Sequence, residues 1–173
     1  LATKIMKLAA WNVNSLKVRL PQLLDWLDRE QPDVVCLQET KLEDAHFPAE
    51  EIAAAGYHFA CSGQKTYNGV ALLARNALSD VVCGNPFYPD EQKRLLLATV
   101  DGIQVICAYV PNGQAVGSDK YAYKLAWLEA LLRWLEERLA INPQLVLAGD
   151  FNIAPDDRDV HDPQAWAGQI LCS

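Results

Sequence analysis

Histidine is scarce in this chain of 173 residues, which contains only three histidines, and its five cysteines are widely spaced. No two cysteines have the C-x-x-C spacing that is typical of zinc sites, and no Ser-His-Asp arrangement is evident. A zinc centre and serine-type nucleophilic catalysis are therefore disfavoured. We expect reduced cysteines that behave as small hydrophobic residues. We also expect His46, His58 and His161 to lie at the surface or behind the site rather than in it.

Long apolar runs are also missing. No stretch reaches the roughly 18 apolar residues needed to span a bilayer, and the N-terminus lacks the apolar region of a signal peptide. We therefore expect no membrane partner and a cytoplasmic location, at the nucleoid if the source is bacterial. Because the chain starts at Leu1, we expect residues 1–5 to be additional N-terminal residues and Met6 to be the native start.

Positive charge is in the minority, because 15 lysines and arginines face 22 acidic residues and the net charge is −7. Nucleic-acid binding depends on lysine and arginine at the phosphates, so this composition excludes a protein that is basic all over its surface. Binding to DNA would require a local basic face. The length favours a single domain.

What the sequence does contain is a set of four short apolar runs, each followed by polar residues that could bind a metal ion or a phosphate. A buried strand explains the apolar part but not the polar endings. Strand ends that lie side by side in a sheet would bring these groups into one cleft. The endings are Asn12 and Asn14 after 8–11, Gln38 and Glu39 after 34–37, Tyr109 and Asn112 after 105–108, and Asp150 and Asn152 after 145–148.

The remaining pattern predicts a mixture of helices, hairpins and buried strands, which favours an α/β sandwich with a mixed or largely antiparallel sheet. Asp101-Gly102 is the strongest hairpin signal, and Ser118 can cap a long helix with one leucine-rich face, formed by Leu125, Leu128, Leu132, Leu135 and Leu139. No regular terminal element is recognisable over 166–173. We expect helices at 20–31, 48–55 and 118–140, and strands at 7–12, 33–38, 57–61, 70–75, 78–83, 94–100, 103–109 and 144–148.

The chemistry of the endings favours phosphoester hydrolysis. Glu39 is a hard oxygen ligand, which suits Mg²⁺ or Mn²⁺ better than zinc. Asp150 can accept a proton from water while Asn152 holds that water or a phosphate oxygen. Tyr109 and Asn112 add donors where negative charge would develop. Each residue alone also has an ordinary interpretation, as a solvated carboxylate, a core aromatic or a turn residue, and only the set favours a site.

Five segments together resemble the exodeoxyribonuclease III family of apurinic/apyrimidinic (AP) endonucleases, within the endonuclease/exonuclease/phosphatase superfamily. The resemblance implies a four-layered α/β sandwich of the deoxyribonuclease I-like type. It also implies Mg²⁺-dependent cleavage of DNA 5′ to abasic sites, with 3′-5′ exonuclease and 3′-phosphatase activity, and double-stranded DNA with abasic sites or 3′ ends as the partner. The segments are 12–16, 37–41, 63–71, 108–113 and 149–155.

The resemblance also implies roles for single residues. Glu39 would bind the metal, with Asn12 and Asn14 close to it. Asp150 would activate or orient water, with Asn152 as its partner at the phosphate. The remaining members would contact the phosphate or the DNA, namely Tyr109 and Asn112 at the phosphate, and Lys41, Lys65, Tyr67, Asn68 and Arg94 along the DNA.

The sequence departs from the family at its end, because the C-terminal third with a closing Ser-Asp-His motif is not present after Ser173. We therefore expect 6–173 to be the N-terminal part of a single domain whose sandwich is incomplete. A separate C-terminal fragment would complete it, and the 173-residue chain alone would be inactive. Two alternatives stay open: a non-catalytic module that binds DNA or protein, and a phosphoesterase of the same superfamily with another substrate.

Overall fold

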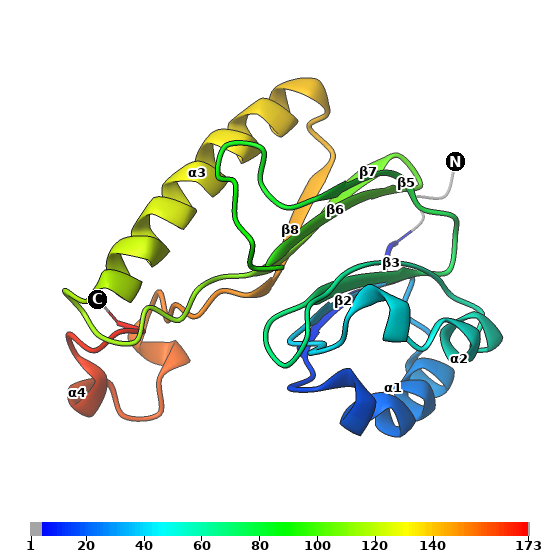
Figure 1. Ribbon diagram of the computed structural model, residues 1–173, viewed down its shortest axis with the longest axis horizontal. Helices are drawn as coiled ribbons and strands as arrows, with labels where there is room; N and C mark the ends of the chain where they lie inside the picture. Colours follow the sequence, from blue (N-terminus) through cyan, green and yellow to red (C-terminus); the bar gives the residue numbers. More distant parts are fainter. Residues whose placement is uncertain (1–4, 173) are drawn as a thin grey trace.

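The computed structural model describes residues 5–172 and consists of two four-stranded sheets stacked between layers of helices. Figure 1 shows the order of the layers, with α1 and α2 outside one sheet and α3 outside the other. One apolar cluster fills the space between the sheets, and one lies under each helical layer. The predicted α/β sandwich is confirmed. The prediction that residues 1–5 are additional N-terminal residues falls almost entirely outside the described residues.

The first sheet contains β1 (Leu8–Asn12), β2 (Val34–Gln38), β3 (His58–Ser62) and β4 (Val70–Ala74) in the order β1-β2-β4-β3. β1 and β2 are parallel, whereas β4 is antiparallel to both of its neighbours. Every residue of β2 and β4 is buried. This burial explains why both strands are continuous apolar runs in the sequence, because each has a covered surface on both faces.

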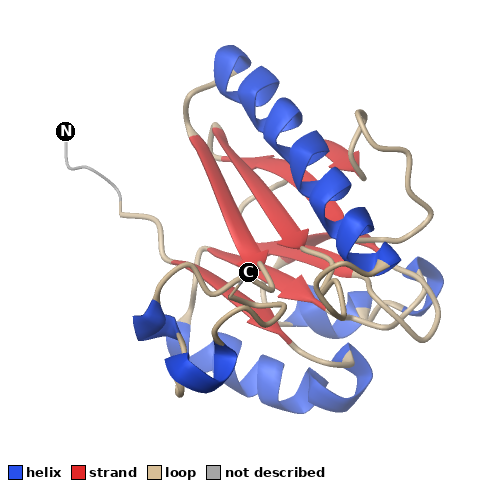
Figure 2. Cartoon of the chain, turned by 90° about the vertical axis from the view of Figure 1, so that its left-hand side faces the viewer, coloured by secondary structure: helices blue, strands red, loops and turns tan. Residues whose placement is uncertain are grey.

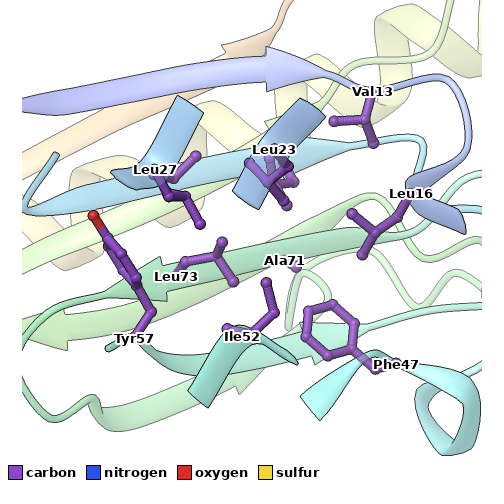
Figure 3. Packing of buried hydrophobic residues seen from close by; sticks show 11 residues of the cluster. Val13, Leu16, Leu23, Leu27, Phe47, Ile52, Tyr57, Ala71 and Leu73 are labelled. Carbon is purple, nitrogen blue, oxygen red and sulfur yellow. The ribbon is translucent and has the colours of Figure 1, made fainter. Parts of the chain in front are cut away.

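Three helical segments, α1 (Leu16–Glu30), the short 3-10 helix η1 (Asp44–His46) and α2 (Ala49–Ala54), lie near the outer face of this sheet. Figure 3 shows side chains of α1 and α2 meeting the sheet residues Ala71 and Leu73. The predicted start of the first helix at 20 is wrong, since α1 begins four residues earlier and contains Pro21. Tertiary bonds fix this earlier start: the amide of Leu16 donates to Thr40 O, and its side chain is fully buried.

The second sheet contains β5 (Ser79–Cys83), β6 (Leu95–Val100), β7 (Ile103–Tyr109) and β8 (Leu145–Asp150) in that order. The predicted hairpin joins β6 and β7, with Asp101 and Gly102 both at positive φ. β7 and β8 are parallel, so both sheets are mixed. All six residues of β8 are only partly buried, because β8 is an edge strand.

The long helix α3 (Asp119–Ile141) connects β7 to β8 and lies along the outer face of the second sheet (Figure 2). Ser118 caps it, as predicted, by accepting a hydrogen bond from the amide of Tyr121 at 3.1 Å. The face that α3 buries is aromatic and includes Trp127 and Trp134. Three members of the leucine-rich face are about half exposed, namely Leu125, Leu132 and Leu139.

After β8 the chain forms the 3-10 helix η2 (Asp157–Asp159) and the four-residue helix α4 (Pro163–Trp166). The sequence pattern did not indicate α4, whose signals are local: Asp162 accepts a hydrogen bond from the amide of Ala165, and Pro163 occupies the first turn. Among residues 5–172, no helix has both the length and the apolar character required to cross a bilayer.

Candidate active site

The predicted site residues follow four strands whose carboxyl ends meet at one edge of the sandwich. The register pairs Asn12 with Gln38 across β1 and β2, and Tyr109 with Asp150 across β7 and β8. Each pair of parallel strands therefore delivers its two endings to the same place. The two sheets face each other here, so endings far apart in the sequence become neighbours.

Asn12 is the link between the two sheets. Its side-chain Nδ2 donates to Glu39 Oε1 at 2.8 Å and to Asp150 Oδ2 at 2.8 Å. Both side-chain amide hydrogens are therefore used, one on each carboxylate. We call Asn12, Glu39, Tyr109 and Asp150 the carboxylate cluster. One amide thus holds two negative groups together that would otherwise repel each other.

Glu39 is the most heavily bonded member of the carboxylate cluster. Besides Asn12, the hydroxyl of Tyr109 donates to Oε1 at 2.8 Å, and Lys41 Nζ lies 3.0 Å from Oε2. Partial burial acts to raise the pKa of Glu39, but the hydrogen bonds from Asn12, Tyr109 and Lys41 outweigh it and lower that pKa. Glu39 is therefore ionised at neutral pH and holds a full negative charge at this edge of the sandwich.

Tyr109 contributes a neutral hydrogen-bond donor. Burial, together with the hydrogen bond to Glu39 and its charge, raises the pKa of Tyr109 to about 12. The guanidinium of Arg94 lies over its ring at 4.6 Å from the centroid, and Nη1 donates to Tyr109 O at 3.3 Å. These contacts fix the ring, and the hydroxyl keeps its proton at neutral pH.

The segment after β8 forms a tight turn that presents Asp150 and Asn152 together. The amide of Asn152 donates to Asp150 Oδ1 at 3.1 Å, and Asn152 has a positive φ of 48°. Gly149 permits the close approach of β8 to β7, since a Cβ there would lie 1.9 Å from Ala108 O. The Asn152 side chain donates to Val110 O at 2.9 Å. The turn is therefore fixed against the neighbouring strand.

Asn112 joins this second group of polar residues rather than the carboxylate cluster. Its Nδ2 donates to Asn152 Oδ1 at 3.2 Å, and the side chain is exposed. Asn14 does not contact Glu39. Its Oδ1 accepts a short hydrogen bond from Lys41 Nζ, so Lys41 stands between Asn14 and Glu39.

Three of the five residues predicted to lie along the DNA line one surface cavity, whereas Lys41 and Lys65 do not line it. A surface cavity next to Tyr109 is lined by Tyr67, Asn68, Arg94 and Asn112, among others. Lys65 and Tyr67 are exposed, whereas Asn68 is buried and donates to the side-chain oxygens of two glutamines, Gln64 and Gln92. Asn68 therefore lines the cavity and also holds Gln64 and Gln92 together by hydrogen bonds.

The donor set fits a hard divalent cation. Glu39 and Asp150 offer carboxylate oxygens on either side of Asn12, and no histidine or cysteine lies in the carboxylate cluster. Oxygen ligands of this kind suit Mg²⁺ and Mn²⁺. The set is small, however, because residues 5–172 contain no group of three or more acidic, histidine or cysteine side chains able to surround a metal ion.

Two residues that support the site, Gln92 and Lys124, belong to no sequence motif and could not be predicted from the sequence. Gln92 accepts hydrogen bonds from Arg94 Nε at 3.0 Å and Nη2 at 2.9 Å, which fixes the guanidinium over Tyr109. Lys124 is buried under the segments that carry Asn112 and Asn152. The three histidines are exposed, as the sequence predicted.

The fold and the carboxylate cluster define an α/β sandwich with a polar site at the strand ends, rich in carboxylates and amides. The chain belongs to the endonuclease/exonuclease/phosphatase family, whose model matches residues 9–170. Among curated relatives, exodeoxyribonuclease III of Haemophilus influenzae is 34% identical over 161 residues, which cover 90% of this chain and 60% of that protein. An exodeoxyribonuclease of Bacillus subtilis is 31% identical over 165 residues, covering 92% and 64%. The predicted resemblance is confirmed.

Solved structures agree with this assignment. A 3′-5′ exonuclease from Neisseria meningitidis has a TM-score of 0.95 and 47% identity, over 97% of this chain and 66% of that chain. A Neisseria 3′ phosphatase bound to a product DNA hairpin has the same TM-score and 46% identity, over 98% and 66%. An AP endonuclease from Archaeoglobus fulgidus has a TM-score of 0.92 and 39% identity, over 96% and 65%. The chain thus spans between 60% and 66% of the length of these relatives.

Proposed function

We propose that this chain supplies one wall of the active site of a Mg²⁺-dependent DNA-repair phosphodiesterase that cleaves DNA 5′ to abasic sites. The observation that carries the proposal is the carboxylate cluster itself, in which Asn12 bonds Glu39 and Asp150 at 2.8 Å each. It joins an ionised carboxylate, a neutral phenol and a second carboxylate at one cleft. The names of the exodeoxyribonuclease relatives support DNA as the substrate.

The residues of the cleft divide the reaction between them. Asp150 accepts a proton from water, whose oxygen attacks phosphorus as the bond from phosphorus to the 3′ oxygen breaks. Asn152 lies two residues on and bonds to Asp150 Oδ1, so its side chain can orient the water or a phosphate oxygen. The hydroxyl of Tyr109 remains a neutral donor and can stabilise charge that develops on the phosphate.

Glu39 would hold the metal ion, with Asn12 beside it and Asn14 on the far side of Lys41. A bound Mg²⁺ or Mn²⁺ would neutralise charge on a phosphate oxygen and on the leaving group. Lys41 lies 3.0 Å from Glu39 Oε2 and provides a positive charge at the same carboxylate. A carboxylate must be ionised to bind a metal ion, and the lowered pKa of Glu39 keeps it ionised at neutral pH.

DNA would lie along the cavity beside Tyr109. Arg94 gives this cavity a positive charge, and Tyr67 offers an exposed ring. Lys41 and the exposed Lys65 would add positive charge along the DNA. Asn112 would face the phosphate, and Asn68 would line the groove. Most of these contacts would be to the phosphate backbone of the DNA. Such contacts position the DNA but carry little sequence preference.

A second candidate is processing of 3′ ends, with 3′-5′ exonuclease or 3′-phosphatase activity and little abasic-site cleavage. The 3′ phosphatase and the 3′-5′ exonuclease from Neisseria favour it, since these proteins are 46% and 47% identical to this chain. Both reactions attack a phosphoester with the same groups. The three reactions differ in the nucleotide on the 3′ side of the phosphate, which is abasic in abasic-site cleavage, the intact 3′-terminal nucleotide in exonuclease action, and absent in 3′-phosphatase action.

A C-terminal fragment would supply the opposite wall. β1 and β8 are both edge strands, and edge strands present unpaired backbone groups to a partner strand. The exposed leucines of α3 add an apolar surface to the described part of the chain. We therefore propose that 6–173 is part of one domain and that the 173-residue polypeptide by itself cleaves DNA negligibly. If the role is only to bind DNA or protein, the chain joined to its C-terminal fragment would bind its partner without cleaving DNA.

The test compares three DNA duplexes, carrying an internal abasic site, a recessed 3′ hydroxyl or a 3′ phosphate. Each is incubated with Mg²⁺ and either the 173-residue chain or a fusion of the chain to the C-terminal remainder of the Neisseria meningitidis exonuclease, here called the completed polypeptide. We expect cleavage only by the completed polypeptide, and its loss in Glu39→Gln. Cleavage of 3′ ends without abasic incision would select the second candidate. Binding without any cleavage would reject both.

A further inference from the structure

Lys124 is an unusual residue for the inward face of α3, since its side chain is only 3% exposed. A buried ammonium group is costly unless it is paired or fully hydrogen-bonded. Within residues 5–172, none of the ion pairs involves Lys124. Charge neutralisation therefore does not explain the lysine at this position. The hydrogen bonds of its ammonium group must offset the cost of burial.

The ammonium bonds to the backbone of two site segments at once. Lys124 Nζ donates to Asn152 O at 2.7 Å and to Asn112 O at 3.3 Å. The side chains of the same two asparagines are joined by a hydrogen bond of 3.2 Å. Lys124 thus bonds to the backbones of both asparagines, whose side chains bond to each other. Burial lowers the pKa of Lys124, in keeping with a group withdrawn from water.

The start of α3 packs closely against the same loop. Ser118 Oγ donates to Gly113 O at 3.0 Å. A Cβ at Gly113 would lie 3.0 Å from Lys124 Cδ and 2.9 Å from Ile170 Cδ1, so the loop rests directly on the lysine stem. The position of the loop is therefore set by the helix and not by the sheet alone.

We infer that Lys124 is a positioning residue that fixes the Asn112 and Asn152 side chains relative to each other at the strand ends. It acts through backbone carbonyls and does not touch the substrate. The inference rests on the proposed function for its catalytic consequence, but the positioning itself is a property of the folded chain. None of the motifs that indicate the site includes this residue.

The first arm of the test measures positioning in the 173-residue chain by NMR exchange of backbone amides with water. Lys124→Met keeps the unbranched apolar stem and removes the ammonium. We expect exchange at Val110 and Asn152 to rise at least about tenfold, while Leu72 in the first sheet is unchanged. Lys124→Arg should restore most of the protection, and exposed Lys17→Met serves as the matched control.

The second arm measures turnover by the completed polypeptide. Lys124→Met should lower kcat by roughly 10- to 100-fold, as expected when reacting groups are misplaced by about 1 Å, with KM nearly unchanged. Wild-type exchange and kcat in Lys124→Met would overturn the inference. A rise in exchange throughout the chain would also overturn it, because the lysine would then be a general stabiliser. If the wild type does not cleave DNA, the proposed function fails while the exchange arm still decides the role of Lys124.

Discussion

Replacing Asn12 with aspartate tests the carboxylate cluster sharply, because the change reverses the hydrogen-bonding character of one atom with almost no change in size. Asn12 Nδ2 donates to both Glu39 and Asp150 at 2.8 Å. In Asn12→Asp the donor becomes an acceptor, and three carboxylates share one space. Asn12→Ala is the matched control, since it removes the same two hydrogen bonds without adding charge.

The expected magnitudes follow from the contacts. A hydrogen bond to a charged group contributes about 1.5–3 kcal/mol, and the partial exposure of this site favours the lower end for the pair. Two like charges 4 Å apart repel by about 1 kcal/mol in water and about 4 kcal/mol near a protein surface. We therefore expect Asn12→Ala to lower the free energy of unfolding by about 1–2 kcal/mol and Asn12→Asp by about 3–4 kcal/mol.

Urea unfolding at pH 7 and pH 4, with and without Mg²⁺, measures both effects. The gap between Asn12→Asp and Asn12→Ala should narrow at pH 4, where carboxylates begin to protonate, and should narrow at pH 7 when Mg²⁺ is added. Equal stability of the two variants at pH 7, with no response to pH or Mg²⁺, would refute the arrangement. The wild type provides the reference under every condition.

Three further outcomes are expected. Gly149→Ala should lower the free energy of unfolding by about 1–3 kcal/mol through its clash with Ala108 O, and an unchanged thermal midpoint would contradict the close approach. Tyr109→Phe should lower kcat of the completed polypeptide on the order of 100-fold, and wild-type turnover would exclude the phenol from the reaction. Because the pKa of Glu39 is lowered on folding, its contribution to stability is present above the unfolded value of about 4.3 and is lost as the pH falls through the lower folded value. Stability measured against pH should therefore have a flatter acid limb in Glu39→Gln, whereas coincident acid limbs would disagree.

The strand ends could be predicted from the sequence because two local signals coincide there. An apolar run followed by polar residues indicates a buried strand with its end at a cleft, and the register of the parallel pairs then places Tyr109 opposite Asp150. The Asp101-Gly102 hairpin is likewise local, since both residues need positive φ. Such features depend on neighbours in the sequence.

Features that depend on distant partners could not be predicted. The early start of α1 comes from the bond between Leu16 and Thr40, and the leucine-rich stripe on α3 gives no sign that Trp127 and Trp134 are the buried residues. Lys124 reads in the sequence as an ordinary surface lysine. Its role is visible only once α3 is placed under Asn152.

The most direct test of the central claim is incision of a duplex with a single abasic site by the completed polypeptide and its Asp150→Asn variant, under single-turnover conditions. We expect Mg²⁺-dependent cleavage 5′ to the site and a loss of at least about 100-fold in the variant, because Asp150 accepts the proton of water. Incision that persists without Mg²⁺, or that is undiminished in Asp150→Asn, would show that the carboxylate cluster is not the catalytic wall.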